Sequence, residues 1–150
     1  MSLNGNWSSL SDPFPQLDGF IRGRTRVATT AYHLFQRIDG EAPHILEGFN
    51  LYLVTEYQGK GSRIKAECWI YGDNKSARRA FDFFKTKKVV YLDRDQVLDQ
   101  TLINHLLLRA VKDRYLIRIT IGVKDKSMIL LASQKIVRRL DGLDLQILRL

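Results

Sequence analysis

The chain has few residues that could build a metal or redox centre. Its 150 residues include one cysteine, Cys68, and three histidines. A single cysteine cannot form an internal disulfide or a thiolate metal cage, which favours a reducing, intracellular compartment. His33, His44 and His105 form no His-x-x-x-His or Cys-x-x-Cys pair, so we expect no metal or other cofactor. His105 lies in an apolar run, and we interpret it as a core or interface histidine.

Long hydrophobic runs and chain breakers are also scarce. No window approaches the ~20 apolar residues of a membrane-spanning helix, and residues 1–17 lack the basic start of a secretory signal. Three prolines and ten glycines argue against a long linker. We therefore expect a soluble or peripheral cytoplasmic protein. Residues 1–20, rich in Ser, Asn, Asp and Pro, would form a flexible or loosely docked arm, and residues 21–150 a single domain.

Enzyme motifs are missing as well. There is no phosphate-binding Gly-x-x-x-x-Gly-Lys loop and no Gly-x-Gly-x-x-Gly before a helix. Asp93, Asp95 and Asp99 form an acidic cluster that could hold Mg²⁺ in a nuclease. Helix capping explains the same residues and is the favoured interpretation. We therefore expect a protein that is not an enzyme, with a metal-dependent nuclease as the weakest alternative.

The first half of the chain predicts a hairpin followed by a helix. Arg22, Arg24 and Arg26 alternate along an extended segment, and residues 27–38 fit either a helix or a strand, with helix weakly favoured. Residues 49–57 and 63–71 alternate as strands around a Gly-containing loop. The second strand places Cys68 on its inward face, which predicts an inert, buried thiol. After residue 71, Asp73 or Asn74 can cap a basic helix over 74–85.

The second half predicts one more helix and then a meander. Asp93 and Asp95 would cap a helix over 96–112, whose residues 102–108 are apolar nearly all round and would form a buried core element. Residues 115–121, 128–137 and 143–147 would form three antiparallel strands. The order of a hairpin, two helices and a meander predicts an α+β fold with helices packed on an antiparallel sheet.

Positive charge is the main feature that is present. Between residues 60 and 88, nine basic residues stand against three acidic ones, so this stretch carries +6 of the chain's net +8. Such a field attracts polyanions. Two aromatic residues alternate with basic ones on one face of the strand over 63–71, as they would if bases stacked between phosphate contacts. The predicted nucleic-acid site comprises Arg63, Lys65, Trp69, Tyr71, Lys75, Arg78, Arg79 and Lys85.

The first hypothesis is thus a nucleic-acid-binding protein with little sequence specificity, for RNA or single-stranded DNA, with RNA favoured. The alternative is a self-associating, matrix-like structural protein that docks on an anionic membrane or scaffold. In that case the apolar residues of the N-terminal arm would contact the next copy of a homo-oligomer. Lys85, Lys87 and Lys88 would also suit a nuclear import signal, which leaves cytoplasm and nucleus both open.

Overall fold

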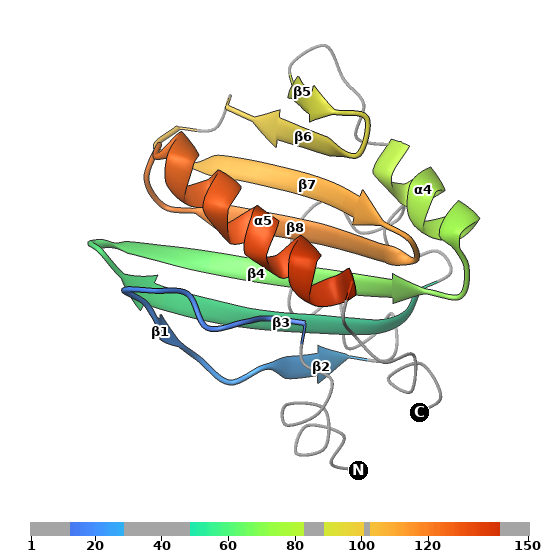
Figure 1. Cartoon of the computed structure of the whole chain (residues 1–150), viewed down its shortest axis with the longest axis horizontal. Coiled ribbons are helices and arrows are strands. Elements are labelled where there is room, and N and C mark those ends of the chain that lie inside the picture. Colours follow the sequence, from blue (N-terminus) through green and yellow to red (C-terminus); the bar gives the residue numbers. More distant parts are fainter. Residues whose placement is uncertain (1–12, 29–48, 83–88, 101–102, 142–150) are drawn as a thin grey trace.

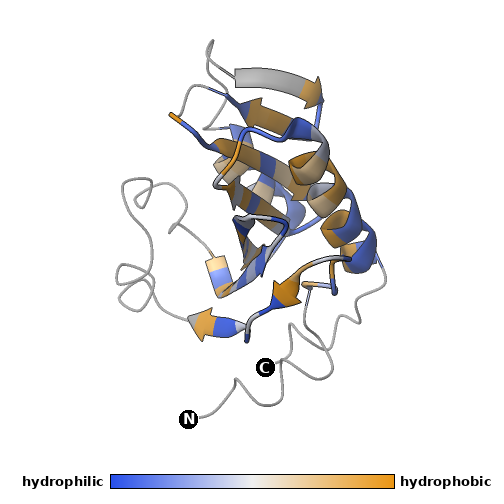
Figure 2. Ribbon diagram, turned by 90° about the vertical axis from the view of Figure 1, so that its left-hand side faces the viewer, coloured by the Kyte–Doolittle hydropathy of each residue, from blue (hydrophilic) through white to orange (hydrophobic). Residues whose placement is uncertain are grey.

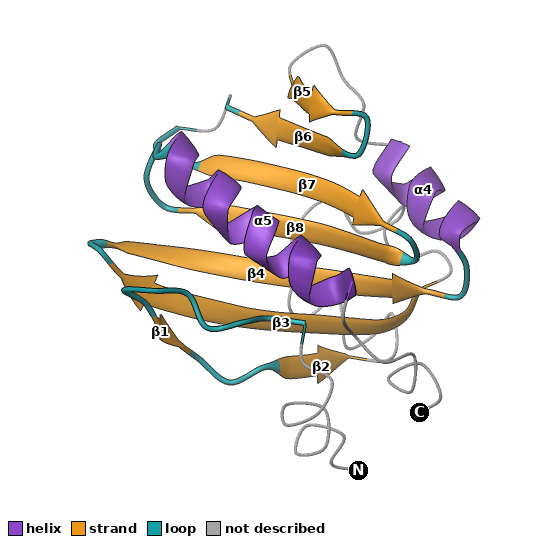
Figure 3. Ribbon diagram, viewed as in Figure 1, coloured by secondary structure: helices purple, strands orange, loops and turns teal. Residues whose placement is uncertain are grey.

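The computed structural model describes residues 13–28, 49–82, 89–100 and 103–141. They form one antiparallel sheet with a helix on each face (Figures 1 and 3). Its strand order is β1-β3-β4-β8-β7-β6-β5, and β2 also pairs with β3. The strands are β1 (Ile21–Arg22), β2 (Arg26–Ala28), β3 (Phe49–Gly59), β4 (Ser62–Tyr71), β5 (Val89–Asp93), β6 (Gln96–Asp99), β7 (Leu106–Lys112) and β8 (Tyr115–Ile121).

The predicted first hairpin is confirmed. β3 and β4 pair from Phe49 opposite Tyr71 to Gly59 opposite Ser62. The two residues of the turn, Lys60 and Gly61, have φ values of 49° and 73°. Two positive φ values in a two-residue turn match the twist of the flanking strands, which is why such turns favour Gly or Asn.

The helix that follows, α4 (Asn74–Asp82), is also confirmed over its described length. The Asp73 carboxylate accepts a hydrogen bond from the Ser76 N–H at 2.8 Å and so caps the helix. Ala77, Ala80 and Phe81 form its buried stripe. Residues 83–88, which include Lys85, lie outside the described residues.

The predicted helix over 96–112 is wrong, because this stretch contains strands β6 and β7. Asp93 accepts a hydrogen bond from the Asp95 N–H at 2.8 Å and stabilises the turn between β5 and β6. Leu106, Leu108 and Ala110 point into one core, and Val111 points into the other. A strand buried on both faces is apolar on both faces, and its sequence therefore resembles a buried helix.

The predicted strand over 128–137 is wrong as well, because α5 (Lys126–Asp141) occupies this part of the chain. The Asp125 carboxylate caps α5 by accepting a hydrogen bond from the Met128 N–H at 3.0 Å. The antiparallel meander lies instead in β5 to β8, which are neighbours in chain order. The strand predicted over 143–147 lies outside the described residues.

The two helices cover opposite faces of the sheet, which confirms the α+β fold with helices packed on sheet. α5 crosses β4, β8 and β7 (Figure 1) and covers the larger core, where the even-numbered residues of β4 and the odd-numbered residues of β8 point. α4 packs on β4, β7 and β8 from the other side, over a second core. Hydrophobic residues predominate in the strands, whereas α5 alternates hydrophobic and hydrophilic stretches (Figure 2).

The end of the predicted N-terminal arm packs against the larger core. Phe14, Leu17 and Phe20 are buried there, and the Tyr57 hydroxyl donates a hydrogen bond to the Pro15 carbonyl at 2.8 Å. Residues 1–12 lie outside the described residues. So does most of the ambiguous stretch 27–38, of which only the first two residues are seen, in β2.

Candidate functional site

The structure does not bring the predicted site residues together. Arg63 lies beside the β3–β4 turn. Tyr71 is at the opposite end of β4, where the chain leads into α4. Eight residues of extended chain separate these two positions by about 26 Å. The β3–β4 turn, which Arg63 follows, is thus at one end of the sheet, and α4 is at the other (Figure 1).

The expectation that Trp69 and Tyr71 lie on an exposed face is wrong. Both side chains are 0% exposed and belong to the second core, beneath α4. The Trp69 ring packs on Tyr52 with ring centroids 4.9 Å apart. On this face of β4, the end that carries the two aromatic residues is therefore covered by α4. Neither ring is available to stack on a base.

Of the three predicted cations on α4 that the structure describes, one is part of the fold. Arg78 donates to the Asp95 carboxylate at 2.6 Å and to the Arg94 carbonyl at 2.7 Å, which ties α4 to the β5–β6 turn. Lys75 and Arg79 are exposed. The acidic cluster accordingly has structural roles, and no group of three metal-binding side chains occurs among the described residues.

A buried ionic network, which sequence analysis missed, lies on the α4 side of the sheet. The Glu67 carboxylate accepts hydrogen bonds from Arg118 at 2.7 and 2.9 Å and from the Tyr52 hydroxyl at 2.6 Å. Burial, followed by the Glu67 charge, raises the pKa of Tyr52 well above its usual value. Glu67 and Arg118 are direct neighbours on β4 and β8. The alternation pattern placed Glu67 on this face but could not show that the face is buried.

Two further expectations concern single residues. Cys68 points into the larger core and is buried, as predicted, and burial raises the pKa of its thiol. The low thiolate fraction makes it a poor nucleophile. Of the two roles predicted for His105, the core role is wrong, because this histidine is exposed in the turn before β7, with Nδ1 2.7 Å from the Ile103 carbonyl. The interface role stays a prediction.

Among the described helices and strands, α5 has the largest number of basic residues. Its basic residues Lys135, Arg138 and Arg139 fall on successive turns near its C-terminus, and Lys126 begins it. Lys135 is partly exposed, and the other three are exposed. The single acidic residue within α5, Asp141, contacts Lys112 at 3.2 Å. This surface could not be predicted from the sequence, because the strand expected over 128–137 contained Lys135 but left Arg138 and Arg139 outside it.

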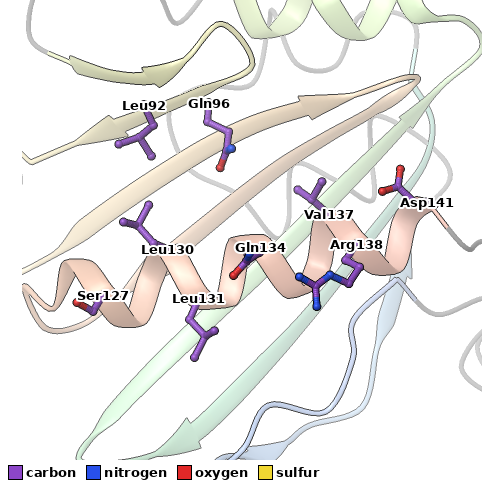
Figure 4. A pocket seen from close by; sticks show the side chains of 9 residues that line it. All are labelled: Leu92, Gln96, Ser127, Leu130, Leu131, Gln134, Val137, Arg138 and Asp141. Carbon is purple, nitrogen blue, oxygen red and sulfur yellow. The ribbon is translucent and has the colours of Figure 1, made fainter.

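An open groove of about 630 Å³ runs along α5 on the side of β5 and β6 (Figure 4). Leu92, Leu130 and Val137 supply apolar walls, and Gln134 and Arg138 stand at the helix surface. Leu131, 49% exposed, is one of the few large apolar side chains left open to solvent among the described residues. The outer side of α5 therefore combines positive charge with a hollow surface.

Comparison with known proteins identifies the fold and no family. No family model matches the chain, and no curated protein matches it. Among solved structures, the chain is similar to the extracellular domain of PknH from Mycobacterium tuberculosis. The TM-score is 0.58 at 10% sequence identity, over 83% of this chain and 86% of that one. This likeness shows a shared fold alone. Neither described helix is long and apolar enough to cross a membrane.

Proposed function

We propose that this protein is a non-enzymatic nucleic-acid-binding protein that engages RNA or single-stranded DNA through phosphate contacts made by α5. The observation that carries the proposal is the group of three basic residues near the C-terminus of this helix, Lys135, Arg138 and Arg139, which lie within about 100° of one another around its axis. We refer to them as the α5 basic surface. RNA is the favoured ligand, and single-stranded DNA is the alternative.

The mechanism is neutralisation of phosphates, without base stacking. A 16-residue helix spans about 24 Å, long enough to follow several nucleotides of an extended strand. Three phosphate contacts with a single strand give a slope of log K against log salt of about −2. Since the aromatic residues of β4 are buried, we expect little sequence preference.

A matched pair of double variants tests the location of the surface. Arg138→Glu with Arg139→Glu alters the α5 basic surface, and Lys75→Glu with Arg79→Glu alters the exposed cations of α4. Each pair lowers the net charge by four units, so the non-specific attraction of the protein to RNA changes equally. The two variants differ only in the helix that carries the substitutions. We expect the α5 pair to weaken binding of labelled single-stranded RNA at least tenfold more than the α4 pair at about 0.1 M salt.

Three outcomes would overturn the proposal. Equal loss in both variants would mean that net charge alone drives binding. A larger loss in the α4 variant would return the site to the surface predicted from the sequence. Negligible RNA binding by the wild-type protein at low salt would remove the nucleic-acid function. Sedimentation with anionic liposomes and analytical ultracentrifugation would then test the matrix-like alternative.

A further inference from the structure

A second, more enclosed pocket lies on the other flank of α5. It has a volume of about 320 Å³ and is formed by the N-terminal segment around Leu17 to Phe20, the β3–β4 turn with the start of β4, and α5 as far as Lys135. Phe20, Ile64 and Met128 give it apolar walls. This volume is at the lower end of the range for ligand sites, which is roughly 300–1,000 Å³, so the occupant would be small.

Glycine at two positions allows these walls to approach one another. A Cβ at Gly59 would lie 2.1 Å from the Gly19 carbonyl oxygen and 2.9 Å from the Phe20 Cα, so only glycine permits the contact between the N-terminal segment and β3. Gly19 itself has a φ of 83°. A Cβ there would lie 2.5 Å from Cε of Lys60, so the lysine side chain runs directly over this glycine.

Lys60 is held at the pocket in a conformation that its residue type disfavours. Its φ of 49° is in the left-handed region, which costs a non-glycine residue on the order of 1 kcal/mol. Its ammonium lies 5.7 Å from the centroid of the Phe20 ring. Asn or Gly would satisfy the turn better. The backbone conformation therefore does not explain why lysine occupies position 60, whereas the position of its side chain at the pocket does.

Two lysines and two aspartates line the opening. Lys60 and Lys135 line the pocket from two different elements, and no ion pair joins either one to an acid in the described part of the chain. Of the two acids at the opening, Asp125 is engaged as the cap of α5. Asp18 is the other. Two ammonium groups above an apolar floor suit a ligand with an anionic head and a hydrophobic body.

We propose that this pocket binds a small amphipathic carboxylate, with its head group between Lys60 and Lys135 and its hydrophobic body against Phe20, Ile64 and Met128. The proposal is independent of nucleic-acid binding, because its ligand and its apolar contacts are different. Lys135 belongs to both surfaces, and a bound carboxylate would therefore reduce the positive charge that α5 presents to RNA.

Methyl labelling of methionine provides a local test. The chain has two methionines, Met1 and Met128, and Met128 lines the pocket. Decanoate, added below its micelle concentration to the ¹³C-methyl-labelled protein, should shift the Met128 methyl resonance in a saturable, one-to-one manner. Acetate has the same head without the body, and decyltrimethylammonium has the body with the opposite charge. Neither should reproduce the shift at the same concentration.

A double variant removes the anion contacts while keeping the fold. Lys60→Asn suits the left-handed turn, and Lys135→Gln keeps the length of a helix side chain. Together they should weaken decanoate binding at least tenfold, whereas Lys75→Gln with Arg79→Gln, which loses the same charge on α4, should not. Absence of a saturable Met128 shift, equal binding of decyltrimethylammonium, or equal loss in both variants would each overturn the proposal. None of these readouts involves RNA.

Discussion

Substituting Gly59 by alanine should detach the N-terminal segment from the sheet. Gly59 has no positive φ, so its backbone conformation suits alanine, and the cost comes from space alone. The added Cβ would lie 2.1 Å from the Gly19 carbonyl oxygen and 2.9 Å from the Phe20 Cα. Both neighbours are backbone atoms, and no change of side-chain rotamer relieves the overlap. Either β3 shifts or residues 13–20 move away.

The free energy gained when residues 13–20 dock on the sheet limits how much Gly59→Ala can destabilise the protein. Phe14, Leu17 and Phe20 are 3%, 4% and 8% exposed, and burial of each contributes about 2 kcal/mol. Ordering of the segment's backbone and side chains offsets most of this gain, which leaves a net contribution of a few kcal/mol. We therefore expect Gly59→Ala to lower the free energy of unfolding by about 2–3 kcal/mol.

Gly61→Ala in the same turn is the matched control. Gly61 has a φ of 73° and nothing within 4 Å of an added Cβ, so alanine there costs only the left-handed conformation, about 1 kcal/mol. Urea unfolding followed by circular dichroism gives both values. Trypsin should also cut after the exposed Arg24 faster in Gly59→Ala than in Gly61→Ala. Equal destabilisation, with unchanged cleavage, would refute the steric argument.

Three further predictions concern the core and the helix cap. Iodoacetamide should leave Cys68 unmodified in the native protein and alkylate it at the rate of unfolding, because burial raises the pKa of the thiol; rapid alkylation of the folded protein would contradict this. Glu67→Ala should cost about 3–5 kcal/mol in urea unfolding, because it leaves the Arg118 charge buried without its carboxylate, and adding Arg118→Met should restore part of the loss. The Ser76 N–H lowers the pKa of Asp73 below its unfolded value. The resulting stability is complete above the unfolded pKa, near 4, and is lost as pH falls through the folded pKa. The variant Asp73→Asn keeps a cap without a titrating group, so its stability should fall less between pH 4 and pH 2.

The sequence by itself determined the elements whose signals are local. Asp73 and the apolar spacing of Ala77, Ala80 and Phe81 were sufficient to predict α4, and the glycines at 59 and 61 were sufficient for the first hairpin. Alternation along β4 also placed Cys68 correctly in the core. These signals arise from a few neighbouring residues, whose hydrogen bonds and periodicity do not depend on the rest of the chain.

Only the tertiary structure decided which strand faces are covered. Because both faces of the sheet are buried, β7 has the apolar composition of a buried helix. The Asp93–Asp95 turn, which precedes it, contains the same residue types as a helix cap. The basic and aromatic residues of β4 show the same dependence. The position of α4, set by packing between elements far apart in sequence, buries Trp69 and Tyr71 and separates Arg63 from Lys75. The candidate binding surfaces consequently lie on α5 and not on β4. Their basic residues, apolar walls and the glycines that allow close packing come together only in the folded chain.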